Sequence, residues 1–431
     1  MANRKMLRCY RFIACLLVAI LTLVASSAPV SAQVELIQTV ELLEDKSASA
    51  HLNDVLTENF VPSNQSISLG YSASAYWIKM RILPPADGGS VILLVNPQML
   101  DDVLLFAPVP MSQAAPEMQA SDASYEIMDR SMGLTPRTYI LSPPMSGADY
   151  FLRIASAGSI SLNVSAQSAD DAMRTVNLVH FVQFIYVSFM ILLLVWALRG
   201  FMLFKEPVLL IFLPLISLWI VHNLFSFGYL SVILSSHDAE KLGFIFRCIA
   251  LILSLIVFLF HRTLLNPFQL SNRAKLLINS HLLAILILTV IFIFYDKNIA
   301  LKANAYLIAI SPITFFIAAA TARHDAFIRL NIVKVFYLLL SFFNIFWAAQ
   351  LLGFNTEFIG SYNGALAYGV VTSFLIFLIL SKYNSEAARV VITNREKLDK
   401  LHQAELIEFE KRKSMIGFID MLTHETKNAL S

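Results

Sequence analysis

The chain has 431 residues, of which 57 % are hydrophobic and only 14 % carry a charge, compared with about 25 % charged residues in an ordinary soluble domain. Apolar runs of about 20 residues, the length of a membrane-spanning helix, recur in its second half. This composition predicts a membrane protein and excludes intrinsic disorder, a collagen fold and nucleic-acid binding as a main role. The net charge of +2 conceals a segregation, because residues 33–170 hold six Lys or Arg against fifteen Asp or Glu.

Residues 1–32 have the three parts of a secretory signal peptide. A basic start is followed by the apolar stretch Phe12–Ala25, and Val30-Ser31-Ala32 places small residues at −3 and −1 of a cut before Gln33. We expect cleavage there, because the apolar stretch is short for a membrane span; the alternative is an uncleaved first anchor. Cleavage leaves Cys248 as the only cysteine, so no disulfide is expected within one chain.

Residues 33–170 alternate apolar and polar side chains over short stretches such as Trp77–Ile82 and Tyr150–Ile154. Turn-forming segments such as Pro84–Gly89 separate these stretches. Such a period of two with regular turns predicts an antiparallel β-sandwich. Because the segment follows a signal peptide, we expect the sandwich on the exported side of the membrane.

Apolar runs joined by short loops predict a seven-helix membrane domain over residues 176–380. The runs are 176–198, 207–225, 242–260, 276–295, 303–322, 335–354 and 358–380. With the sandwich outside, the first, third and fifth loops should be cytoplasmic and rich in Lys and Arg. These loops hold eight Lys or Arg, and the other three loops hold three. The leader and the loop charges therefore agree in placing the C-terminal tail in the cytoplasm.

Several polar side chains interrupt the apolar runs: Arg247, His222, Asn223, Asn344 and Gln350. Inside a bilayer such groups cost free energy unless they pair or face a cavity. Arg247 lies near the outer end of its run, so the simpler interpretation is that its guanidinium reaches the lipid headgroups.

The tail from residue 382 onward is highly charged and nearly free of Gly and Pro, which predicts a continuous helix leaving the membrane. Apolar residues recur at heptad spacing, but Glu405 and Glu408 fall where the next core positions should be. The heptad positions are Val391, Leu398 and Leu401 before the interruption and Met415, Phe418 and Leu422 after it. We predict a coiled coil with a stutter over 382–414 and hence a homodimer. The alternative is a single solvated helix.

The segment from Phe418 to Ser431 resembles the H-box of sensor histidine kinases, with His424 followed by Glu425 and, one helical turn later, by Asn428. The resemblance implies that residues 415–431 begin a dimerisation and phospho-acceptor helix. In that family a neutral imidazole attacks the γ-phosphorus of ATP, and a neighbouring carboxylate hydrogen-bonds the other ring nitrogen. His424 would be the phospho-acceptor, Glu425 its acid/base partner, and Asn428 the residue that positions water for dephosphorylating a response regulator.

The chain ends seven residues after His424, and no ATP-binding domain precedes it. We therefore expect a truncated transmitter, which binds no cofactor itself and would use ATP and Mg²⁺ only as part of a full-length kinase. No metal site is expected, because the position four after His424 is Asn428 and not a second histidine.

The exported and membrane parts resemble bacterial seven-transmembrane receptors with diverse intracellular signalling modules. The resemblance rests on Leu69–Trp77, Leu94–Pro97 and the acidic Asp101-Asp102. It implies a periplasmic jelly-roll-like sandwich related to carbohydrate-binding modules, a seven-helix domain in the inner membrane and an interchangeable output domain.

Tyr71, Tyr76 and Trp77 are candidate residues for stacking on a small periplasmic ligand such as a carbohydrate. Neighbouring strand residues point to opposite faces, so at most one of Tyr76 and Trp77 can face outward, and core packing is the favoured interpretation for Trp77.

Together these features predict a transmembrane sensor histidine kinase of a two-component phosphorelay. The alternative is a non-enzymatic seven-helix receptor whose tail only dimerises or docks a signalling partner.

Overall fold

The computed structural model of the protein describes residues 35–96, 100–109, 125–128, 137–230, 239–322, 330–354 and 361–429. The predicted signal peptide, residues 1–32, lies outside the described residues. The chain divides into two compact units, Met1–Phe377 and Leu378–Ser431.

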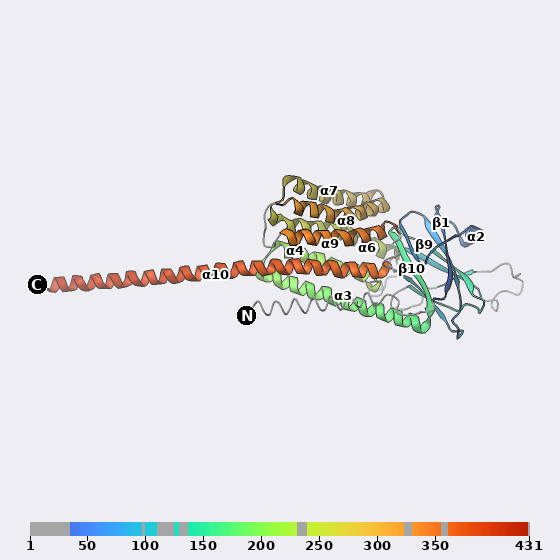
Figure 1. Ribbon diagram of the computed structural model, residues 1–431, viewed down its shortest axis with the longest axis horizontal. Helices are drawn as coiled ribbons and strands as arrows, with labels where there is room; N and C mark the ends of the chain where they lie inside the picture. The colour runs from blue at the N-terminus through green and yellow to red at the C-terminus, as the bar shows by residue number, and fades with distance from the viewer. Residues whose placement is uncertain are drawn as a thin grey trace. The chain divides into compact units, whose positions relative to one another are not determined.

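Two antiparallel sheets form the N-terminal domain (Figure 1). One sheet has the strand order β2-β1-β4-β9-β6-β7 and the other has the order β3-β10-β5-β8. The strands are β1 (Ile37–Asp45), β2 (Val61–Pro62), β3 (Ser66–Tyr71), β4 (Ala75–Ile82), β5 (Val91–Asn96), β6 (Asp102–Pro108), β7 (Tyr125–Met128), β8 (Arg137–Leu141), β9 (Ala148–Ala155) and β10 (Ser159–Ser168). The prediction of an antiparallel β-sandwich in this part of the chain is confirmed.

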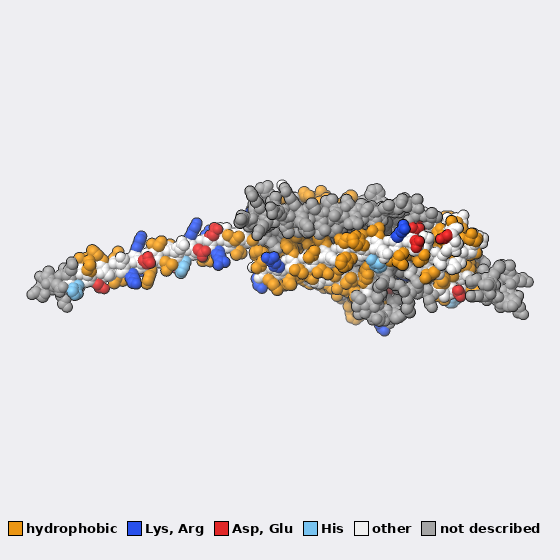
Figure 2. Space-filling view, turned by 90° about the horizontal axis from the view of Figure 1, so that it is seen from below, with side chains coloured by type: hydrophobic (Ala, Val, Ile, Leu, Met, Phe, Trp, Pro, Cys, Tyr) orange, Lys and Arg blue, Asp and Glu red, His pale blue; other side chains and the backbone are white. Residues whose placement is uncertain are grey.

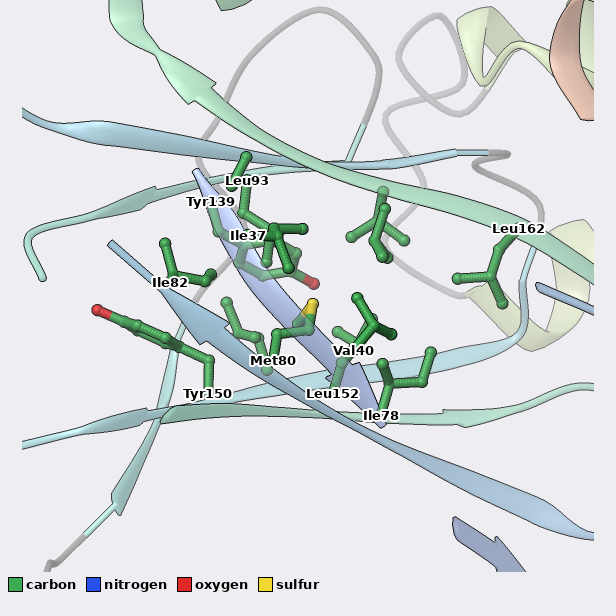
Figure 3. Packing of buried hydrophobic residues seen from close by; sticks show 14 of the residues in the cluster. Ile37, Val40, Ile78, Met80, Ile82, Leu93, Tyr139, Tyr150, Leu152 and Leu162 are labelled. Atoms are coloured by element: carbon green, nitrogen blue, oxygen red, sulfur yellow. The ribbon is translucent and has the colours of Figure 1, made fainter. Parts of the chain in front are cut away.

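The sandwich core follows from the alternation of side chains along β4. Ile78, Met80 and Ile82 are fully buried between the sheets, where they meet residues of the other strands (Figure 3). Lys79 and Arg81 point to the opposite face, where they pair with Asp149. This is the behaviour of a strand with one face in the core and one face toward water.

Six helices long and apolar enough to cross a membrane follow, among the residues that the structure describes. They are α3 (Ala169–Phe204), α4 (Pro207–Ser226), α6 (Ala239–Leu265), α7 (Asn272–Phe294), α8 (Lys297–Ala320) and α9 (Leu330–Leu351), with a short 3₁₀ turn, η1 (Asn266–Phe268), before α7. They lie side by side in Figure 1, and Figure 2 shows hydrophobic side chains gathered over their surface. Exposed apolar surface on this scale fits a bilayer.

The seventh predicted run, 358–380, falls on the N-terminal part of α10 (Ser361–Ala429). Residues 355–360 and the side chains of 361–372 lie outside the description, so the seventh membrane helix stays a prediction.

Helix α3 is longer than the apolar run 176–198 predicted, because it begins directly after β10. Its first turn carries Asp170 and Asp171, which an apolar-run criterion excludes but which the positive end of a helix dipole favours. Ser168 caps this end by accepting from the backbone N–H of Asp171.

In the unit Leu378–Ser431 the described residues, up to Ala429, form the C-terminal part of α10, which confirms the predicted helix in this part of the tail. Ion pairs one turn apart line its surface, including Lys382 with Glu386 and Arg412 with Glu408. The hydrogen bond from Lys382 lowers the pKa of Glu386 below its ordinary value. The coiled coil is not tested by this single chain.

Candidate functional site

The sandwich passes into the membrane domain without a linker, because Ser168 is both the last residue of β10 and the cap of α3. Its Oγ donates to a carboxylate oxygen of Asp171 at 2.9 Å. Thr175 Oγ1 donates to Gln167 Oε1 at 3.0 Å, which joins the second turn of the helix to the strand. These bonds make the covalent connection stiff.

A second connection joins the sandwich to helix α6 through one carboxylate. Arg247 Nη1 donates to both oxygens of Asp101, at 2.8 and 2.7 Å. Asp101 Oδ2 also accepts from the backbone N–H of Ala157 at 2.8 Å and from Ser156 Oγ at 3.1 Å. The side chain of Asp101 is only 18 % exposed and that of Arg247 only 7 %. The segment before β6, the β9–β10 turn and α6 therefore meet at Asp101.

Gly243 makes this approach possible. It lies one helical turn before Arg247, and a Cβ at its position would come within 2.1 Å of Asp101 Oδ1. Real side-chain carbons do not approach an oxygen so closely, so any larger residue here would displace the carboxylate.

A third connection joins β3 and β10 to the end of α9. Gly70 and Gly353 both have left-handed backbones, with φ of +67° and +91°, and a Cβ on Gly70 would lie 2.7 Å from the carbonyl oxygen of Leu352. Ser159 Oγ donates to the carbonyl oxygen of Leu351 at 2.7 Å. That carbonyl belongs to the last turn of α9 and cannot be satisfied within the helix, so the sandwich supplies its donor.

Tyr71 lies at the same junction and not on an open sugar-binding surface. Its ring packs with Cys248 and Ile291 against a cluster formed by Leu251, Phe292, Ala300 and Leu301 of the helices. Burial raises the pKa of the Tyr71 hydroxyl to about 12.

Tyr76 and Trp77 face opposite sides of β4, as predicted, but neither faces water. Tyr76 belongs to the core between the sheets, and its hydroxyl lies 3.2 Å from Ser72 Oγ. Trp77 is 0 % exposed, and its ring centroid lies 5.5 Å from that of Phe106, so the prediction of core packing is confirmed for Trp77. The expected platform of stacking rings is not formed by these three residues, because residues 46–60 cover the face to which Trp77 points.

His424 is exposed on α10, and Glu425 and Asn428 follow it in the same helix. The side chains of Glu425 and Asn428 lie outside the described residues, so their geometry around His424 stays a prediction.

The pairing of Arg247 with Asp101 corrects the interpretation that its guanidinium reaches the headgroups. Asn223 and Asn344 each donate to the backbone carbonyl four residues earlier in the same helix. The ring of His222 stacks on Phe246. The side chain of Gln350 lies outside the described residues. The sequence signal for the junction was the coincidence of Asp101-Asp102 in an acidic domain with a lone arginine in an apolar run.

The comparisons with known proteins concern the sandwich. Residues 37–168 match the family model described as 7TMR-DISM extracellular 2, a range that coincides with β1 to β10. No curated protein matches the chain. The matched domain and the six membrane-length helices support a multi-pass transmembrane receptor with an N-terminal extracellular domain.

Proposed function

We propose that the protein is a transmembrane signal receptor in which the extracellular sandwich controls the helices through the Asp101–Arg247 pair. The observation that carries this proposal is the way the protein accommodates the pair. A buried guanidinium lies at the outer end of α6, the β9–β10 turn donates to the carboxylate, and a glycine leaves room for it. A domain that only covered the helices would not need a polar contact of this cost.

Such a pair suits a two-state element. Withdrawal of one partner from a buried ion pair is strongly disfavoured, because it leaves an uncompensated charge away from water, so partly separated positions should be poorly populated. A ligand that prefers one arrangement of the sandwich by a few kcal/mol is sufficient to shift the population of the helices.

For the output we propose a sensor histidine kinase of a two-component phosphorelay. The exposed position of His424 on a long helix supports this role, because a phospho-acceptor must be reached by a separate ATP-binding domain. Glu425 would take the proton from the far ring nitrogen as the phosphorus–nitrogen bond forms and the bond to the β-phosphate oxygen breaks, which releases ADP. Asn428 would position water when a response regulator is dephosphorylated. ATP and Mg²⁺ would be bound by the ATP-binding domain and not by the residues of this tail.

The test is phosphorylation of the chain joined to a histidine kinase ATP-binding domain. We expect an acid-labile phosphohistidine that disappears in His424→Gln and persists in His402→Gln, the matched variant at another exposed histidine of α10. Asn428→Ala should slow removal of phosphate from the regulator more than it reduces His424 labelling. Label that survives His424→Gln would refute the assignment.

The homodimer is part of the same proposal. Leu398 and Phe418 are 66 % and 57 % exposed in the single chain, as expected of core positions of a coiled coil that are buried only when a partner helix binds. Cysteines at these two positions should crosslink efficiently, and a cysteine at Lys400 should crosslink poorly. Equal yields at all three would exclude a preferred face.

The exposed apolar residues of the tail also fit the second candidate function, a receptor whose tail docks a signalling partner without catalysis. A crosslinked tail without any phosphohistidine in the fused protein would favour this candidate.

A further inference from the structure

A second apolar cluster lies on the outer face of the six-stranded sheet, separate from the core between the sheets. It consists mainly of aromatic rings: Trp77 and Phe106 with centroids 5.5 Å apart, Phe60 and Phe151 at 5.9 Å, and Tyr125 and Phe151 at 5.3 Å. Residues 46–60, called the strap from here on, cover this cluster. Leu52 and Val55 of the short helix α2 (Leu52–Val55) are the strap residues that bury it most directly.

The cluster contains a buried donor without an acceptor. Trp77 is 0 % exposed, and its indole Nε1 makes no hydrogen bond to the part of the chain that the structure describes. A buried N–H without a partner costs free energy, and a core that served packing alone would place a phenylalanine at this position. The aromatic faces around the indole supply no strong acceptor, so a molecule that enters the cluster with an acceptor would relieve this cost.

The hydrogen bonds of the strap are mostly local in sequence. Asp45, the last residue of β1, accepts from the backbone N–H groups of Ser47 and Ala50, and within the strap the N–H of His51 donates to Asp54. A contact to a strand distant in sequence is made by Arg153, whose Nη2 donates to the carbonyl oxygen of Ala48 at 2.8 Å. A segment held mainly by local contacts opens at a lower free-energy cost than the core strands.

Arg153 also connects the strap to the junction. Its Nη1 pairs with Asp102, the residue next to Asp101, and the turn that follows Arg153 supplies the Ser156 and Ala157 donors to Asp101. Displacement of the strap would therefore free the Nη2 group of Arg153. Arg153 is connected to Arg247 through Asp102 and its neighbour Asp101.

We propose that the strap covers a ligand site. An uncharged, ring-shaped ligand that carries a hydrogen-bond acceptor displaces α2, stacks on the aromatic rings and accepts from Trp77 Nε1. Charge is disfavoured in the ligand because the charged groups of this face are already paired. Lys79 pairs with Glu41 and Asp149, Arg81 pairs with Asp149, and Arg153 keeps its Asp102 partner when the strap moves. The assignment rests on the proposed receptor function and gives it a sensing site. A sugar ring with one apolar face and a phenol-like aromatic ring share this chemistry.

The first test asks whether the strap opens. In a full-length background without its native cysteines, reconstituted in lipid nanodiscs, Val55→Cys and Val95→Cys are compared for their rate of reaction with a maleimide. Both valines are buried, at 3 % and 0 % exposure, but Val95 belongs to the core between the sheets. We expect Val55→Cys to react about tenfold faster or more, because local opening is far more frequent than global unfolding. Arg153→Gln should increase the Val55→Cys rate further. Equal rates for the two cysteines would overturn the proposal.

The second test addresses the ligand with two probes, methyl β-glucoside and phenol. If one probe accelerates Val55→Cys labelling in a saturable way, the ligand carries that type of ring, a sugar or a phenol. Trp77→Phe should abolish the acceleration, and Trp219→Phe should leave it unchanged. No acceleration by either probe would refute the ligand class. Because neither measurement involves His424, a negative result here with intact His424 phosphorylation would remove the strap site and leave the proposed receptor function standing.

Discussion

Two ion pairs of the same chemical type lie in opposite settings in this protein. Arg247 and Asp101 join the helices to the sandwich with side chains only 7 % and 18 % exposed, whereas Arg412 and Glu408 lie on the tail with side chains 76 % and 67 % exposed. Water screens the second pair, so it contributes little to stability. The first pair is shielded, and withdrawal of either partner leaves an uncompensated charge. The comparison teaches that position, and not the pair itself, decides whether an ion pair can act as a switch.

Apolar residues follow the same division. At the junction Tyr71 packs against side chains of the helices within the same chain. On the tail Leu398, Phe409 and Phe418 are each more than half exposed. Apolar residues are thus covered at the junction and exposed to solvent on the tail.

The largest effect should come from Asp101→Ala, which leaves the Arg247 guanidinium buried without its partner. We expect a loss of about 3 kcal/mol of unfolding free energy, measured by thermal unfolding in detergent. Asp87→Ala, at an exposed turn, serves as the control and should change little. Adding Arg247→Leu to Asp101→Ala should restore part of the loss, and no restoration would show that the pair is not the coupled unit.

A smaller effect is expected for Gly70→Ala. Alanine in a left-handed conformation costs about 1 to 2 kcal/mol, and at this site its Cβ would also meet the Leu352 carbonyl. Gly88→Ala isolates the backbone cost, because Gly88 has a φ of +71° and nothing within 4 Å of the added carbon. Equal destabilisation by the two substitutions would mean that the end of α9 does not press on β3.

Alkaline pH should weaken the junction through Tyr71. Its pKa is about 12 in the folded chain and about 10 when unfolded, so its stabilising effect is full below pH 10 and is lost as the pH rises toward 12. The loss is at most about 1.4 kcal/mol for each pH unit in this window. Tyr71→Phe should flatten the profile of unfolding free energy between pH 10 and pH 12. An unchanged profile would argue that the hydroxyl reaches water.

The smallest effect should come from Arg412→Ala, which removes the exposed tail pair. We expect a change of about 0.3 kcal/mol in helix stability, detected as a slight loss of helicity by circular dichroism and reduced further by salt. An effect as large as that of Asp101→Ala would show that the tail is buried against a partner in solution.

Features with a short sequence period were predictable. The alternation along Trp77–Ile82 gave the sandwich and the opposite facings of Tyr76 and Trp77, and the apolar runs gave six helices that the structure contains. Features that depend on distant residues were not. Arg247 and Asp101 are 146 positions apart, and the cover over Trp77 comes from a strap that has no apolar period of its own. The start of α3 was also missed, because its first turn is set by a cap and by acidic residues and not by hydrophobicity.

The direct passage of β10 into α3 has a mechanical consequence. A flexible linker would allow the sandwich to rotate without moving the helices. Here Ser168 ends β10 and caps α3, so the strand and the helix should rotate together. The sandwich is also bonded to α6 and to α9 at separate points, so a tilt of the sandwich would load three helices at once. Two or three glycines inserted after Ser168 should uncouple the strand from the helix. The sandwich would keep its contacts with α6 and α9, but a rotation of β10 would no longer be transmitted to α3.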